Sequence, residues 1–146
     1  MLTHEQLMES WSTDCKIDPT ALLERMYRHP LLHSKYLTIL QGYKVQQRKL
    51  TLKYQKNRLQ KTRYFNGELT QEELQELGWK QYLFRKPMKS EMETLIDADS
   101  DLQLMQEQIL YIETLIQSSE SILKDLGQQY FLYKSIIDQT KFLNGG

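Results

Sequence analysis

Apolar residues recur every three or four positions along most of the chain, which is the spacing of one face of an α-helix. The pattern is most regular near the carboxyl end, where spacings of three and four alternate from Leu95 to Ile137. Such a repeat of 3.5 residues, sustained over several heptads, is typical of a left-handed coiled coil. Leu115, Ile122 and Ile136 lie beside this seam and widen the apolar face, which favours several helices around an axis.

The seam predicts a long carboxyl-terminal helix that joins copies of the chain. Its mixed side chains select no particular oligomeric state. Gly127 lies inside the pattern and predicts a kink or a break into a short final helix. The residues that we expect to hold several chains together are Leu102, Met105, Ile109, Ile112, Ile116, Leu123, Leu126 and Tyr130.

Caps and helix breakers divide the amino-terminal part of the chain. We expect a short amphipathic helix within residues 1–17, followed by a turn. Asp18 precedes a proline and predicts the start of a second helix. This helix is expected to end near His29, because Pro30 disfavours helical geometry in the residue before it.

The middle of the chain reads as a long rod followed by short elements. Residues 31–65 have helical spacing throughout, and Asn66–Gly67 supplies a helix end. A capping-box pattern at Thr70 and a glycine at Gly78 bound a two-turn helix between them. Residues 79–87 form a connector of aromatic and basic residues, and a second capping-box pattern, which begins at Ser90, opens the last helix.

Lysine and arginine are concentrated in one part of the chain. The whole sequence is balanced, with 19 basic and 19 acidic residues, yet residues 25–66 contain no aspartate or glutamate. Like charges at helical spacing cost about 0.2–0.5 kcal/mol per pair, so a polyanion or an acidic surface of the assembly has to compensate them. The eleven basic residues of this stretch are Arg25, Arg28, Lys35, Lys44, Arg48, Lys49, Lys53, Lys56, Arg58, Lys61 and Arg63.

Aromatic residues are interleaved with these charges. Cations that neutralise phosphates, together with rings on which bases stack, are the pattern of proteins that bind single-stranded nucleic acid without sequence preference. Tyr36, Tyr43 and Tyr54 fall on the same stripe as the leucines, so they also fit ordinary core packing. The charges point to nucleic acid more strongly than the rings do.

The sequence lacks the usual signatures of catalysis. It contains no GxxxxGK[ST] phosphate loop, no GxSxG elbow and no HExxH motif. His29 and His33 have no third ligand near them in sequence, and the aspartates of residues 97–101 lack the glycine and glutamate of a calcium loop. We therefore expect no enzyme activity, no metal and no cofactor.

Two further observations indicate in which cellular compartment the protein is expected. Cys15 is the single cysteine, which excludes an internal disulfide and fits a reducing cytoplasm. No apolar run approaches the roughly 20 residues that span a bilayer, and the first residues lack the pattern of a signal peptide. Neither export nor membrane insertion is expected.

Several segments, in order along nearly the whole chain, together resemble the UvsY-type recombination mediators of T-even-like and related phages. The family's DNA-binding motif is a basic cluster before an aromatic pair and a glycine, and Arg58, Lys61 and Arg63 match it ahead of Tyr64, with Leu59 where the family has a lysine. The matching segments are Ile17–Thr20, His33–Leu37, Arg63–Gly67, Lys89–Thr94, Ala98–Leu102, Glu120–Lys124 and Phe142–Gly146.

The resemblance implies a function and an assembly. Members of this family form homo-oligomeric rings, bind single-stranded DNA, and load the phage RecA-like recombinase onto strands covered by the phage single-stranded-DNA-binding protein. A ring of about six or seven subunits in the cytoplasm of the infected bacterial host is implied here. Recombination, replication and repair of DNA are the processes that such a protein serves, without a cofactor or a membrane.

Pattern and resemblance combine into one expectation. The fold is all-α, with a long basic helix and a long carboxyl-terminal coiled-coil helix joined by a short helical connector. Residues 1–88 form the helical DNA-binding region, and residues 89–146 form the coiled-coil oligomerisation region. The residues expected to contact DNA are Lys44, Arg48, Lys49, Lys53, Lys56, Arg58, Lys61, Arg63 and Tyr64.

Two other classes of protein stay open at this point. A structural coiled-coil scaffold or chaperone would pack its basic helix on its own acidic segments and would have no nucleic-acid role. A small enzyme with a composite active site between subunits has no motif to support it. Ion pairs of the basic helix within the fold would favour the scaffold.

Overall fold

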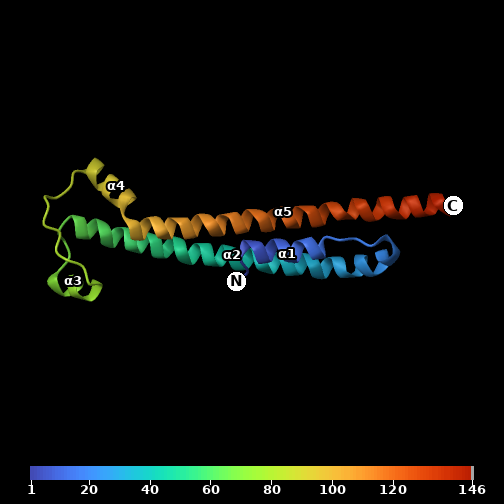
Figure 1. Ribbon diagram of the computed structural model, residues 1–146, viewed down its shortest axis with the longest axis horizontal. Coiled ribbons are helices and arrows are strands. Elements are labelled where there is room, and N and C mark those ends of the chain that lie inside the picture. The colour runs from blue at the N-terminus through green and yellow to red at the C-terminus, as the bar shows by residue number, and fades with distance from the viewer. Residues whose placement is uncertain (146) are drawn as a thin grey trace. The chain divides into compact units, whose positions relative to one another are not determined.

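The computed structural model describes residues 1–145. These residues form helices, turns and irregular segments, and no β-strand (Figure 1). The expected all-α fold, with a long basic helix, a short helical connector and a long carboxyl-terminal helix, is confirmed. The elements are α1 (His4–Asp14), a 3₁₀ turn (Pro19–Ala21), α2 (Leu22–Phe65), α3 (Gln71–Leu77), α4 (Lys89–Ala98) and α5 (Ser100–Leu143).

Side chains next to the helix ends explain most of these boundaries. Thr3 accepts a hydrogen bond from the Gln6 amide at 3.2 Å and caps α1. The Asp18 carboxylate accepts one from the Thr20 amide at 2.9 Å and caps the 3₁₀ turn, as expected. The short helix α3 lies between the Thr70 cap and Gly78, whose φ of 69° is the left-handed geometry that glycine adopts at no steric cost.

The expected helix end near His29 is wrong, because α2 continues through Pro30. Proline lacks the amide that an interior helical residue donates, so the helix loses one hydrogen bond there. Arg25, His29 and Leu32 are all buried at spacings of four and three on either side of the proline. Burial of this continuous stripe outweighs the local preference, and the basic rod therefore begins at Leu22.

The expected single final helix is also wrong, because Asp99 divides it into α4 and α5. Asp99 has extended backbone angles, φ −68° and ψ 122°, and its carboxylate accepts a hydrogen bond from the Leu102 amide at 3.1 Å. An aspartate that caps a new helix cannot also continue the previous one. The start of α4 differs too, since the Glu91 side chain accepts from the Met88 amide and Ser90 lies inside the helix.

The helix α5 runs through Gly127 without the predicted break. The glycine is exposed, whereas Leu126, Gln129 and Tyr133 are buried on one side of the helix. Packing of the neighbouring turns holds the helix together, although glycine weakens a helix interior by about 1 kcal/mol.

The chain divides into two compact units, one made of Met1–Gln46 with Ile112–Gly146 and the other of Gln47–Tyr111. We call them unit 1 and unit 2. In unit 1, α1 packs on the first half of α2, where the Trp11 and Tyr36 rings meet edge to face with centroids 5.4 Å apart. Leu7, Tyr36 and Leu115 are fully buried in this unit. Each of its three helices therefore contributes to its core.

Unit 2 has a separate core. Ile96, Leu102 and Met105 are buried together, and Tyr54 and Phe65 of α2 pack against them. Residues of the predicted oligomerisation seam thus already fill the interior of a single chain. Along the sequence the boundaries of the two units follow Gln46 and Tyr111, and none falls at residue 88. The division of roles between residues 1–88 and 89–146 stays a prediction.

Candidate nucleic-acid interface

The middle of α2 carries cations that are exposed. Five lysine and arginine residues that follow one another in this stretch make no ion pair with a carboxylate among residues 1–145. Lys49, Lys53 and Lys56 follow at spacings of four and three, so they share one face of the helix. The five residues, which we call the free cations, are Arg48, Lys49, Lys53, Lys56 and Arg58.

The other expected DNA contacts already have partners. Lys44 lies 3.7 Å from Glu120, a pair so exposed that it adds little stability. Arg63 donates to the Glu73 carboxylate, with the shorter of the two hydrogen bonds at 3.2 Å. The Glu73 side chain also closes the capping box of α3, so this ion pair joins α2 to the first turn of α3.

Lys61 is the most strongly engaged of these cations. Its side chain is 13% exposed, and its Nζ lies 3.0 Å from Asp99 and 3.2 Å from Asp101. It also lies over the Trp79 ring, 4.3 Å from the centroid. Burial opposes the charge, but hydrogen bonds to both aspartates and their charges outweigh it, so the pKa of Lys61 lies above its ordinary value. Lys61 is a charged structural link within unit 2.

Tyr64 belongs to a cluster of rings. Its hydroxyl donates to the Lys80 carbonyl at 2.6 Å, and its ring touches Phe65, Trp79 and Tyr82 at centroid distances of 5.2–5.8 Å. From the sequence we expected Tyr64 to contact DNA, and we expected no such role for the connector, residues 79–87. The aromatic and basic composition of residues 79–87 was the signal that could have found it.

The expected oligomerisation residues are divided between the core and the surface. Leu102, Met105, Ile112, Ile116 and Leu126 are buried within the single chain, and Ile109 and Leu123 are partly buried. Tyr130 is 57% exposed. A role in joining chains stays a prediction for this set, and for the buried members it competes with packing inside the chain.

Unit 1 contains a buried polar network that the sequence did not reveal. Arg25 donates to the Asp14 carbonyl at 3.0 Å and to Gln129 Oε1 at 2.7 Å, while its Nε and Nη1 have no partner. The Asp14 carboxylate accepts from Lys35 at 2.6 Å and from Tyr36 at 2.8 Å. Burial opposes ionisation of Asp14, but these hydrogen bonds and the nearby cations outweigh it and hold its pKa below the ordinary value.

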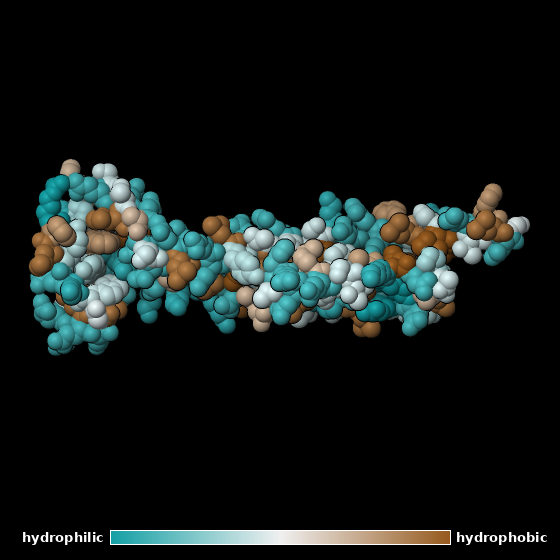
Figure 2. Space-filling model, viewed as in Figure 1, coloured by the Kyte–Doolittle hydropathy of each residue, from teal (hydrophilic) through white to brown (hydrophobic). Residues whose placement is uncertain are grey.

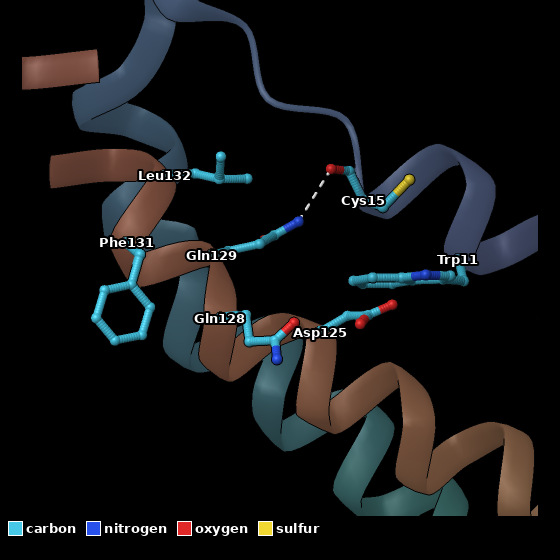
Figure 3. A pocket seen from close by; sticks show the side chains of 7 residues that line it. All are labelled: Trp11, Cys15, Asp125, Gln128, Gln129, Phe131 and Leu132. Carbon is cyan, nitrogen blue, oxygen red and sulfur yellow. Dashed lines mark hydrogen bonds between the residues drawn. The ribbon is translucent and has the colours of Figure 1, made fainter. Parts of the chain in front are cut away.

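A pocket of about 660 Å³ opens beside this network, between α1 and α5. Figure 3 shows Gln129 pointing to the Cys15 carbonyl, to which its Nε2 donates at 3.1 Å. Trp11 and Asp125 line the pocket as well. It holds no cluster of metal-ligating side chains, and none exists in the part of the chain that the structure describes.

We expect the stability of unit 1 to fall in mild acid because of His29. Its Nδ1 lies 2.7 Å from the Tyr133 hydroxyl, and burial, followed by the charges of Arg25 and His33, lowers its pKa below 6.5. Below pH 6.5 the unfolded chain therefore binds a proton that the folded chain refuses, and the free energy of unfolding decreases until the pH reaches the folded pKa. Melting temperatures measured by circular dichroism on both sides of pH 6.5 check this.

A matched pair of variants isolates this effect. His29→Asn should remove most of the loss in acid, whereas His33→Asn, at an exposed position on the same helix, should keep it. An identical acid dependence in both variants would assign the loss to other groups.

No helix among residues 1–145 is long and apolar enough to cross a membrane. The fold and the free cations together define an all-helical protein with a surface suited to a polyanion.

Comparisons with known proteins identify the family within this class. A family model described as "Recombination, repair and ssDNA binding protein UvsY" matches residues 10–146, and the chain belongs to this UvsY family. A crystal structure of the bacteriophage T4 recombination mediator protein UvsY is similar over 100% of both chains, with a TM-score of 0.84 and 23% identity. A second lattice of that protein gives a TM-score of 0.80 at 20% identity, over 97% of this chain and 98% of that one. No curated protein matches the sequence.

Proposed function

We propose that this protein is a recombination mediator that binds single-stranded DNA along α2. It would load a RecA-like recombinase onto strands covered by a single-stranded-DNA-binding protein. The observation that carries the DNA-binding part is the row of free cations in the middle of α2. A phosphate backbone would relieve their mutual repulsion and release counterions. Membership of the UvsY family supports the recombination part.

Assembly would supply the affinity that one subunit lacks. A single chain that neutralises about three phosphates of a single strand would have a salt slope near −2 and would bind weakly at physiological salt. Linking several copies in a homo-oligomeric ring would raise the avidity by about 10²–10⁴ without any new contact. We assign the joining of chains to the carboxyl-terminal seam and the DNA contacts to the amino-terminal region. The site of action would be the cytoplasm of the infected host.

The paired cations would have a secondary part in this scheme. Lys44 would extend the free cations at one end of their row. Lys61 and Arg63 would meet phosphate only by exchanging their carboxylate partners, and Tyr64 only by leaving its ring cluster. No catalytic step is needed, because binding supplies the energy that weakens the covering protein and opens the strand to the recombinase.

Replacing Lys53, Lys56 and Arg58 together by alanine should weaken binding of single-stranded DNA and flatten its salt dependence. Three lost phosphate contacts reduce the slope of log K against log salt by about 2 per subunit. Fluorescence anisotropy with a labelled oligonucleotide at several salt concentrations measures both quantities. Recombinase filament formation on covered strands, measured with the same variant, should fall in parallel.

The control removes the same charge elsewhere. Lys16, Lys124 and Lys134 are exposed in unit 1, and their triple alanine variant should keep the salt slope. Equal slopes for the two triple variants would refute the interface on α2. If the unaltered protein itself binds no oligonucleotide, the structural scaffold that the Lys61 and Arg63 ion pairs favour becomes the better assignment.

A further inference from the structure

The connector between α3 and α4 combines rings and cations in a way that its linking role does not require. Residues 79–88 form neither a helix nor a strand. They contain Trp79, Tyr82 and Phe84 together with three basic residues, and no aspartate or glutamate. A segment that only links two helices is usually polar and rich in turn residues. This composition therefore points to a contact outside the chain.

The rings form a ladder that leads from α2 to the surface. Phe65 lies 5.3 Å from Tyr82, and Tyr82 lies 5.4 Å from Phe84, both between ring centroids. The inner rings are partly buried, whereas Phe84, at the outer end, is 77% exposed. The inner contacts fix the position of the outer ring, which leaves most of the Phe84 side chain available to a ligand.

Phe84 lines an open groove of about 750 Å³ within unit 2, together with Tyr82, Pro87 and Leu95. This volume is in the range of grooves that hold small organic groups. In Figure 2 hydrophobic and hydrophilic residues lie side by side over the part of unit 2 that holds α3, the connector and α4. A lining that combines aromatic and aliphatic side chains with Arg85 and Glu91 suits a group that is flat and apolar on its faces and polar at its rim.

The charges around the groove favour an anion. Its single carboxylate, Glu91, lies 2.8 Å from Arg85 and also accepts the Met88 amide, so its charge is already compensated. Lys86 and Lys89 are exposed and make no ion pair within residues 1–145. The surface beside the rings is therefore cationic.

A second groove connects this site with the free cations. It has a volume of about 280 Å³, and Pro87 lines both grooves. Arg58 of α2 and Lys89 line it together with one carboxylate, Glu93, so its lining is cationic by one charge. One strand could then follow a continuous path from the cations of α2 to the rings of the connector. Such a succession of phosphate contacts and stacking platforms is how proteins hold single strands.

We propose that the connector groove binds a base of single-stranded nucleic acid, which stacks on Phe84 while neighbouring phosphates meet Lys86 and Lys89. This inference rests on the proposed function and adds base contacts to the phosphate contacts of α2. Stacking is tolerant of sequence because every base has an apolar face.

The test compares a strand that has bases with a strand that has none. Full-length protein carrying Phe84→Ala is titrated with labelled oligothymidine and with an abasic oligonucleotide of equal length. Affinity for oligothymidine should fall about fivefold or more, and affinity for the abasic strand should stay the same. The salt slope should also stay the same, because no cation is removed.

Three control variants separate stacking from other effects. Phe84→Trp should keep the affinity, Phe84→Leu should lose most of it although it stays apolar, and Gln81→Ala, an exposed change in the same connector, should do nothing. Circular dichroism confirms that each variant is folded.

The outcomes distinguish the two proposals. If Phe84→Ala binds oligothymidine as well as the unaltered protein does, the base site is wrong, and a protein partner becomes the alternative ligand of the groove. An equal loss on both strands also overturns the base site. If the unaltered protein binds neither strand, the base site and the proposed function fail together.

Discussion

Replacement of Tyr36 by alanine is expected to lower the free energy of unfolding of unit 1 by about 3–5 kcal/mol. The side chain is fully buried, its ring packs edge to face on Trp11, and its hydroxyl donates to Asp14 at 2.8 Å. Alanine would leave a cavity between α1 and α2 and remove one partner of a buried carboxylate. Urea unfolding followed by circular dichroism measures the loss.

Phenylalanine at the same position is the matched control. Tyr36→Phe keeps the ring and removes only the hydrogen bond, so it should cost about 1–2 kcal/mol. Burial raises the pKa of Tyr36 to about 12, and Asp14 acts in the same direction, so the hydroxyl stays a donor at neutral pH. Equal losses in the two variants would show that the ring contributes little and that α1 is held by the carboxylate.

The second large effect is expected in the seam of α5. Ile112 is buried within the single chain, and Ile112→Asp would place a carboxylate in an apolar core at a cost above about 3 kcal/mol. We expect loss of helical circular dichroism and, as a consequence, a lower particle mass by light scattering. The matched control is Leu104→Asp, an exposed position on the same helix, which should stay folded.

The pair of readouts separates two roles of the seam. A fully helical Ile112→Asp protein with a reduced particle mass would mean that this side chain joins chains and contributes little to its own unit. A helical variant with unchanged mass would contradict both roles.

Local signals in the sequence were sufficient for α1 and α3. Thr70 and Gly78 bound α3 because a side-chain cap and a left-handed glycine act within a few residues. The recurrence of apolar residues every three or four positions likewise predicted two long helices. Such features depend on the nearest turn of the chain, so no knowledge of distant residues was needed.

Features that depend on distant contacts escaped prediction. Pro30 should end a helix on local grounds, and only the burial of His29 and Leu32 on both sides explains why α2 continues. The break at Asp99 was hidden because Leu95 and Ala98 continue the heptad pattern into the preceding helix. The pattern defines an apolar face, but the same face can serve a single chain or several.

The candidate site shows the same division. Composition located the cationic stretch of α2, because charge is visible in sequence. Which cations are free was not visible, since Lys61 meets Asp99 and Asp101 some forty residues further along the chain. The ring ladder of the connector likewise depends on the contact of Phe65 with Tyr82.

Asp99 performs two tasks with one carboxylate. It caps α5 through the Leu102 amide, and it forms the ion pair with Lys61. A phosphate that attracts Lys61 would leave this carboxylate to the Leu102 amide alone. If the proposed interface binds a strand, phosphate binding and order in the first turn of α5 would be thermodynamically coupled through Asp99, and DNA binding would act on the start of a 44-residue helix without any hinge.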